Sequence, residues 1–308
     1  MYNQLFYSYK PFVPRRLQIL FRKVCTRYIR LFSKNSWPID EKAAQKPEGW
    51  KGWPEGKKFA LVITHDVETC GGHEKCKLLV NLEKEMEFRS SFNFTPERYI
   101  VSPDLRKYLT DNGFEVGIHG LKHDGKLYKS RDIFSQRAEK INQYMKDWQT
   151  VGFRSPAMHH NLEWIHDLNI LYDASTFDTD PFEPQPDGMQ TIFPFYVSNE
   201  QTGRGYIELP YTIPQDFTLF ILMRKKNIDI WKRKLNWLVK HGGMALINVH
   251  PDYMNFGGRN TGYEEYPIKY YREFLDYIID NYSGRYWHVL PREMAVFWRR
   301  EVLQIEDK

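Results

Sequence analysis

The alternation of short β-rich runs with longer helical runs is the feature that most restricts the fold of this chain. Apolar, β-branched or aromatic residues predict strands at 59–64, 91–95, 115–118, 152–154, 173–176, 207–211, 244–249 and 286–290. Helical spacing predicts helices between them at 75–88, 103–112, 132–148, 229–241 and 267–282. Repeated strand–helix alternation favours an α/β fold with a parallel sheet, open or closed as a barrel.

Charge divides the chain into a basic N-terminal segment and a body that begins near Lys58. The chain has 308 residues and a net charge of +5, but eight basic residues and no acid precede Asp40. Without those eight charges the remainder carries 5 − 8 = −3, so the basic character belongs to the segment. We expect residues 1–57 to form a basic amphipathic helix and a connector rich in Trp and Pro, and residues 58–308 to form one barrel.

The basic segment contains a run at 15–32 with helical spacing of apolar residues. The apolar positions are Leu17, Leu20, Phe21, Val24, Tyr28, Leu31 and Phe32. A second stripe is basic. Such a helix can lie on an anionic membrane surface. Most amphipathic helices instead pack their apolar face on their own protein or on a partner subunit, and docking is the favoured interpretation.

Cysteine content and hydropathy indicate a cytoplasmic address, with peripheral contact at the inner membrane face as an option. Three cysteines do not describe a disulfide framework and fit a reducing compartment. Neither a signal-peptide pattern nor a membrane-spanning apolar run is evident. Cys70, His73 and Cys76 offer three zinc ligands, but a structural site needs four, so we interpret them as reduced thiols and a histidine at a helix start. No nucleic-acid motif is present.

Polar residues of catalytic type follow several of the predicted strands directly. Asp66 and Glu68 follow the first, His119 and His123 the third, Arg154 the fourth and His250 the seventh. Active sites of α/β barrels lie at the carboxyl ends of their strands. These side chains are therefore expected to meet at one mouth.

The residue types at this mouth suit a divalent metal ion. Histidines four apart on one helical turn would place both imidazoles of His119 and His123 on one face. Asp66 and Glu68, two apart on a strand, leave it on the same side, so one could bind the metal while the other activates a water. Catalytic zinc keeps three protein ligands and one open position. Alternatively, Asp66 caps the following segment or pairs with Arg154.

In this order the motifs resemble those of the polysaccharide deacetylase family (NodB homology, carbohydrate esterase family 4-like). That family has an Asp-Asp motif after its first strand, then His-x-x-x-His, Arg-x-Pro, an aspartate-containing segment and a final histidine at a strand end. The similarity covers roughly residues 59–291. It implies a distorted (β/α) barrel of about seven strands, related to the TIM barrel.

The resemblance also implies roles for individual residues. Asp66 resembles the general base, Arg154 the arginine that orients it, and His250 the general acid. His119 and His123 resemble the two histidine metal ligands. The aspartate that partners His250 is expected within 173–180, where Asp178 is preferred over Asp180.

The first motif departs from the family pattern. Val67 stands where the metal-binding aspartate is expected, and Glu68 fits a variant in which the second acid is displaced by one residue. This leaves open which of Asp66 and Glu68 binds the metal. His65 replaces a common phenylalanine and is interpreted as a supporting or structural residue.

The implied function is metal-dependent hydrolysis of an N-acyl group, with acetyl expected, on an amino sugar of a cell-surface polysaccharide or its precursor. The implied cofactor is one divalent metal, with zinc expected, and the implied partner is a saccharide. Two alternatives stay open: a deformylase or amidase acting on a lipid-linked amino sugar, and a degenerate barrel that only binds carbohydrate. Metal content separates the last from the first two, and acetate or formate release separates those.

Overall fold

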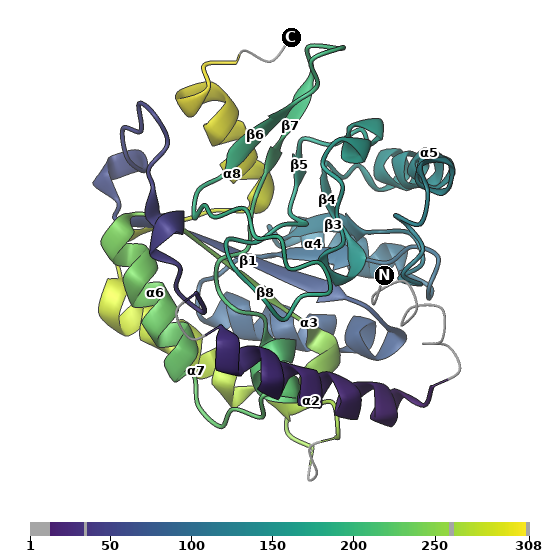
Figure 1. Cartoon of the computed structure of the whole chain (residues 1–308), viewed down its shortest axis with the longest axis vertical. Helices are drawn as coiled ribbons and strands as arrows, with labels where there is room; N and C mark the ends of the chain where they lie inside the picture. The colour runs from purple at the N-terminus through teal and green to yellow at the C-terminus, as the bar shows by residue number, and fades with distance from the viewer. Residues whose placement is uncertain (1–12, 34–35, 259–261, 306–308) are drawn as a thin grey trace.

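A curled, mostly parallel sheet forms the centre of the molecule in the computed structural model, which describes residues 13–33, 36–258 and 262–305 (Figure 1). The parallel strands follow one another around the barrel, with β8 pairing with β1. They are β1 (Phe59–Val67), β2 (Ser91–Phe94), β3 (Glu115–His119), β4 (Gly152–Arg154), β5 (Tyr172–Asp173), β7 (Gly205–Glu208) and β8 (Met244–Val249). A parallel bridge between Ile213, in the segment after β7, and Ile247 of β8 closes the ring. The expected α/β barrel of about seven strands is confirmed.

Two further strands extend the sheet. β11 (Tyr286–His288) pairs in parallel with the first residues of β1, and β6 (Phe195–Ser198) runs antiparallel to β7 at the edge. A separate pair, β9 (Met254–Asn255) and β10 (Tyr266–Pro267), lies near the mouth. The sequence analysis missed β6, β9 and β10, because such short strands carry little periodicity of their own.

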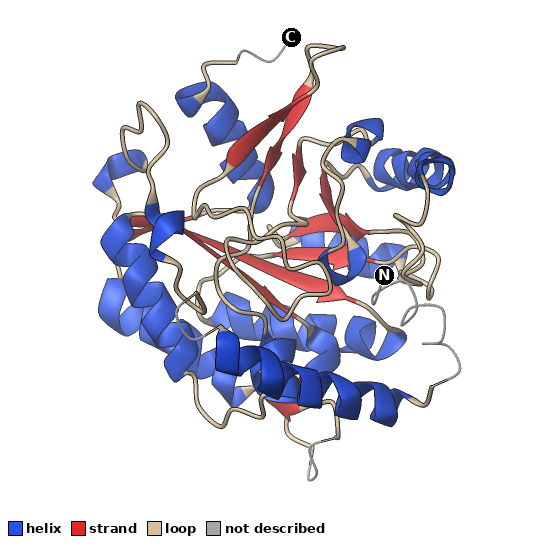
Figure 2. Cartoon of the chain, viewed as in Figure 1, coloured by secondary structure: helices blue, strands red, loops and turns tan. Residues whose placement is uncertain are grey.

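Helices pack around the outside of the sheet (Figure 2). They are α3 (Cys70–Glu85), α4 (Pro103–Asp111), α5 (Arg131–Trp148), α6 (Asp229–His241), α7 (Lys269–Tyr282) and α8 (Pro291–Phe297). α3 begins five residues before the prediction, because the Thr69 side chain accepts a hydrogen bond from the Gly72 N–H and so caps the helix. Within the described residues, no helix combines the length and apolarity needed to cross a bilayer.

β1 is a strand of the barrel wall, paired with β2, β8 and β11, and it is buried along its whole length. Because successive side chains point to opposite faces of a strand, Thr64 and Asp66 face the barrel interior while His65 and Val67 face the surrounding helices. Val67 is fully buried in the apolar core. The inward-facing residues Thr64 and Asp66 therefore contribute to the interior of the barrel, and His65 between them does not.

The N-terminal helix α2 (Arg15–Phe32) has the predicted bounds, but its apolar stripe faces away from the body. Gln18, Ile19, Lys23 and Thr26 are the helix residues that are buried. The residues that we call the apolar stripe are all exposed: Leu17, Leu20, Phe21, Val24, Tyr28, Leu31 and Phe32. The stripe therefore does not pack on the body, whereas packing on a partner subunit, which the favoured interpretation also allowed, stays a prediction.

The connector after α2 joins the same apolar core as the barrel. Trp37 and Trp53 are both buried there, and the Trp53 Nε1–H donates to the Gly242 carbonyl at 2.8 Å. The connector thus shares the core of the barrel. The division of the chain at residue 57 stays a prediction.

Candidate active site

Asp66 lies at the centre of a buried hydrogen-bond cluster at the carboxyl end of β1. Asn93 of β2 donates to its Oδ1 at 3.0 Å, and Asn248 of β8 donates to its Oδ2 at 2.8 Å. Arg154 Nη1 lies 3.4 Å from Oδ1 and also donates to Asn248 Oδ1 at 2.8 Å. Three different strands thus hold both oxygens of one carboxylate in place.

The charge state of Asp66 follows from these neighbours. Burial alone would raise the pKa of Asp66, but in the acid range where a carboxyl titrates the protonated His119 ring and the Arg154 guanidinium outweigh burial and hold the pKa below its usual range. Hydrogen bonding by Asn93 acts in the same direction. Asp66 is therefore a carboxylate at neutral pH and can accept a proton.

Glu68, His119 and His123 form a cluster that fits a metal ion. One ligand atom from each residue lies within 4.8 Å of the others, and among the described residues this is the one group of His, Cys, Asp or Glu side chains that meets this condition. His119 Nε2 is buried and has no hydrogen-bond partner, while its Nδ1 lies 3.2 Å from the Arg154 carbonyl. A ring held in this way at Nδ1 presents a free Nε2 lone pair to a metal.

The protonation states of this cluster also suit a cation. Burial lowers the pKa of His119 to about 4, so the imidazole is neutral and able to coordinate. Burial would raise the pKa of Glu68, but the charge and hydrogen bond of His123 lower it well below the usual value. The Glu68 Oε2 also accepts from the Tyr253 hydroxyl at 3.0 Å. Two imidazoles and one carboxylate are a typical donor set for catalytic zinc.

A loop brings the two histidines together, and not the helical turn that the sequence predicted. His119 ends β3, and His123 lies in the following loop with a left-handed φ of 52°. Gly120 also has a positive φ of 60°, and a Cβ there would meet Pro156 Cδ at 2.5 Å. The tight turn after β3 thus needs glycine, and it brings the two rings to 5.2 Å between centroids.

His250 lies across from this cluster at the end of β8. Its Nε2 is 4.0 Å from Asp66 Oδ2, and its Nδ1 is 2.7 Å from Asp216 Oδ1. Asp216 also accepts the His250 backbone N–H at 2.8 Å and the Tyr266 hydroxyl at 3.0 Å. Burial would lower the pKa of His250, but the Asp216 carboxylate raises it to about 10. The ring is therefore protonated at neutral pH, with Nε2–H available as a donor.

The carboxylate beside His250 is Asp216, and the preference for Asp178 is wrong. Asp178 is buried and pairs with the Lys234 ammonium, while Asp180 accepts from the Tyr211 hydroxyl at 2.9 Å. The residues 173–180 follow β5, whereas Asp216 begins the π-helical turn η6 (Phe217–Leu222) that leads the chain towards α6. A lone aspartate in a predicted loop carried no signal that could have singled it out.

Hydrogen bonds place two further segments that carry polar residues. The Ser155 N–H, which follows β4, donates to the Ser175 hydroxyl at 2.8 Å. His73 Nε2 accepts from the Ser102 N–H at 3.1 Å, and Cys76 is buried against the Gly72 carbonyl. Cys70, His73 and Cys76 therefore lie in the first turns of α3, and His73 is engaged by the chain's own backbone.

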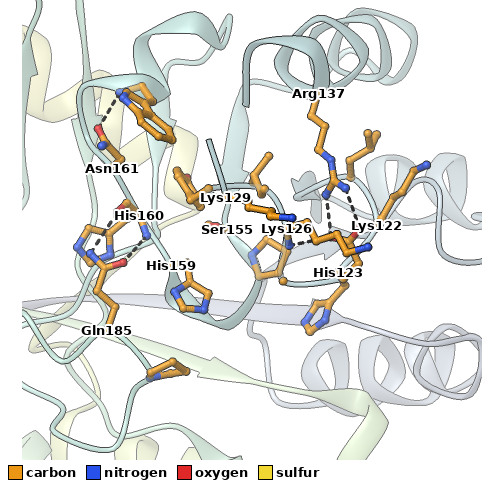
Figure 3. Close-up of a pocket in the computed structure, with 18 of the residues that line it drawn as sticks. Lys122, His123, Lys126, Lys129, Arg137, Ser155, His159, His160, Asn161 and Gln185 are labelled. Carbon is orange, nitrogen blue, oxygen red and sulfur yellow. Dashed lines mark hydrogen bonds and ion pairs between the residues drawn. The ribbon is translucent and has the colours of Figure 1, made fainter. Parts of the chain in front are cut away.

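Two adjoining cavities open onto the cluster. The first, of about 390 Å³, is lined by Asp66, Glu68, His119, His123 and His250, and also by Arg15, Gln18 and Arg22 of α2. The second, of about 720 Å³, shares His123 with the first (Figure 3). Figure 3 shows His123 and His159 at its lower edge, with Asn161 and Gln185 further along. Because the second cavity has many polar groups and lies beside the cluster, it can hold a further part of a hydrogen-bonding ligand that extends beyond the first cavity.

Comparison with known proteins places the fold. No protein-family model matches the sequence, and no curated protein matches it. Among solved structures, a protein from Mycobacterium smegmatis assigned as a polysaccharide deacetylase is 16% identical, with a TM-score of 0.62 over 85% of this chain and 97% of that one. One from Pseudomonas aeruginosa PAO1 with the same assignment is 14% identical, with a TM-score of 0.62 over 86% and 99%. Puue allantoinase is 14% identical, with a TM-score of 0.63 over 87% and 99%.

The chain therefore has the fold of the polysaccharide deacetylases, as the order of its motifs implied. At these identities the likeness concerns the fold alone. What the chain does has to be argued from its own site.

Proposed function

We propose that this protein is a metal-dependent hydrolase that removes an N-acetyl group from an amino sugar of a polysaccharide or its precursor. One observation carries the proposal: a Glu-His-His cluster lies beside an ionised Asp66, and a protonated His250 faces Asp66 at 4.0 Å. Amide hydrolysis needs one group that accepts a proton and another that donates one. Asp66 and His250 supply both on one side of one cleft.

Glu68, His119 and His123 would hold the divalent ion, with zinc as the expected metal. When bound, such an ion polarises the amide carbonyl and lowers the pKa of a water. Asp66 takes a proton from the attacking water, and Arg154 with Asn248 keeps its carboxylate in position. His250 gives a proton to the departing nitrogen, and Asp216 holds its ring in place.

Val67 does not mark a degenerate site in this proposal. Its side chain lies in the apolar core on the outer side of β1, so it takes no place in the cleft. Glu68, one residue further, takes up the position beside the two histidines. The missing second aspartate of the family motif is thus replaced by a longer side chain from the next inward-facing residue.

The test uses two isosteric variants that separate the two acids. We expect the wild type to contain about one zinc ion per chain and to release acetate from N-acetylated amino sugars. Glu68→Gln should lose the ion. Asp66→Asn should keep it and turn over roughly 10²–10⁴-fold more slowly. The readouts are metal content by mass spectrometry and enzymatic detection of acetate, with formate measured in parallel.

Several outcomes would overturn the assignment. Loss of the ion from Asp66→Asn, with retention in Glu68→Gln, would exchange the two roles. Formate release in place of acetate would favour the deformylase. A double variant, Asp66→Asn with His250→Ala, that keeps full activity would refute the mechanism. A wild type that binds no divalent metal and releases no acetate from the substrate would favour the carbohydrate-binding barrel.

A further inference from the structure

Helix α2 lies on the protein by a mainly polar side, which also carries the buried Ile19, and directs the apolar stripe outward. Val24, Leu31 and Phe32 are 57%, 63% and 73% exposed, whereas Gln18 and Lys23 are each 8% exposed. An amphipathic helix that only stabilised the fold would bury its apolar side. A contiguous apolar patch on a surface marks a place where something else binds.

Specific contacts hold α2 in this orientation. The Arg15 guanidinium pairs with Glu264 at 2.8 Å, and Arg22 lies 4.8 Å from the centre of the Phe217 ring. Lys23 lies 4.3 Å from the centre of the Tyr263 ring. These ion-pair and cation–π contacts come from the inward side of the helix, so the outward direction of the stripe follows from contacts that the polar side makes.

The same inward side forms one wall of the cleft. Arg15, Gln18 and Arg22 line the cavity that also contains Asp66 and His250. Figure 1 shows α2 lying across the front of the molecule, beside the mouth of the barrel. Whatever binds the stripe therefore comes to lie next to the entrance of the proposed active site.

The charge around the stripe identifies the kind of partner. α2 contains no acidic residue, and Arg16 and Arg27 are exposed at helical positions next to Leu20. At its other end Arg30 lies near Lys225, and the neighbouring Arg224 is exposed. An apolar stripe bordered by basic side chains fits the interface of an anionic bilayer. In a symmetric dimer through the stripe, the two basic borders would face each other and repel.

We propose that α2 binds the protein to an anionic phospholipid surface through its apolar stripe, which places the cleft beside lipid-carried saccharides. The second half of this statement rests on the proposed function, and the binding itself does not. Tyr28 and Phe32 at the exposed end of the stripe are of the type that lies at a lipid–water interface.

Flotation of the full chain with vesicles tests the binding. We expect the wild type to float with phosphatidylcholine vesicles that contain about 30% phosphatidylglycerol and much less with phosphatidylcholine alone. The triple variant Leu20→Glu, Val24→Glu, Leu31→Glu should bind at least about tenfold more weakly. The matched control Leu78→Glu with Ile100→Glu changes two exposed apolar residues elsewhere, and it should float like the wild type.

The remaining readouts keep the test decisive. The triple variant should retain its metal content and its acetate release from a soluble substrate, since Leu20, Val24 and Leu31 do not line the cleft. If the glutamates impair folding, serines at the same positions replace them and should weaken binding in the same direction. Absence of vesicle binding by the wild type would overturn the proposal. So would a dimer in sedimentation analysis that the stripe variants dissociate while vesicles stay unbound.

A failure of the proposed function gives a different pattern. Flotation that depends on the stripe, together with no acetate release, would leave membrane binding in place and refute the hydrolase. Acetate release without flotation would keep the hydrolase and refute membrane binding.

Discussion

Two histidine–carboxylate pairs of equal length lie on opposite sides of the barrel wall. His250 Nδ1 is 2.7 Å from Asp216, and His65 Nε2 is 2.7 Å from Glu83. His250 lines the cleft, and its Nε2 lies 4.0 Å from Asp66. His65 is completely buried between β1 and the outer helices, where Glu83 also accepts from the Ser90 hydroxyl at 2.6 Å.

The comparison shows that a short bond to a carboxylate does not by itself indicate catalysis. Tyr271 donates a further hydrogen bond to Glu83, so that carboxylate is fully engaged within the wall of the barrel. Asp216 likewise has several donors, but the imidazole that it holds extends to a cavity with room for a substrate. The function of each pair is decided by what its free ring nitrogen can reach.

The largest effect should come from the pair at the cleft. His250→Ala removes the proposed proton donor, and we expect turnover to fall by roughly 10²–10⁴-fold. Metal content should stay close to wild type, because the three proposed ligands are not changed, and the variant should fold with some loss of stability, because the buried Asp216 loses its imidazole partner. Steady-state kinetics with acetate detection, together with metal analysis, measures both. Full activity of this variant would place His250 among the structural pairs.

Substitution in the outer pair, His65 with Glu83, should lower stability and leave turnover unchanged. His65→Phe removes the hydrogen bond to Glu83 while nearly keeping the ring volume, and we expect unfolding to become easier by about 1–3 kcal/mol. Glu83 retains Ser90 and Tyr271 as donors, which limits the loss. Denaturant unfolding gives the stability, and turnover per folded molecule should stay within about twofold of wild type. A large loss of turnover at unchanged stability would break the comparison.

The smallest effect concerns pH. Asp216 raises the pKa of His250 to about 10, because its negative charge favours the protonated ring. In Asp216→Asn this charge is absent, so the ring should lose its proton at a lower pH and the alkaline fall of kcat/KM should move down by about one pH unit or more. Glu83→Gln is the matched control and should leave the position of that fall unchanged. An alkaline limb that stays in place in Asp216→Asn would show that His250 does not determine it.

Local sequence pattern determined much of the barrel and the residues at its mouth. Apolar runs of strand length followed by Asp66, His119, Arg154 and His250 place these side chains at the carboxyl ends of parallel strands, whatever the details of packing. The bounds of β8, α2 and α6 agree with the predicted ones, because each element is long enough to show a period or an uninterrupted apolar run.

Only the tertiary structure decided which residues become partners. Asp216 contacts His250 from 34 positions away, and Asn93 and Asn248 contact Asp66 from other strands. No local pattern reports such pairings, since they depend on how separate strands and loops close over the mouth. The loop at Gly120 likewise brings His123 to 3.0 Å from Glu68, a residue of a different strand end.

α2 shows the same division within one element. Its helical spacing and its two stripes are properties of the sequence, and they predicted both its bounds and its amphipathic character. Which side of the helix faces the body was decided by contacts with distant residues, among them Arg15 with Glu264 and Arg22 with Phe217. A helix's period is set by local backbone geometry, but its orientation depends on the surface it meets, and that surface exists only after the barrel has formed.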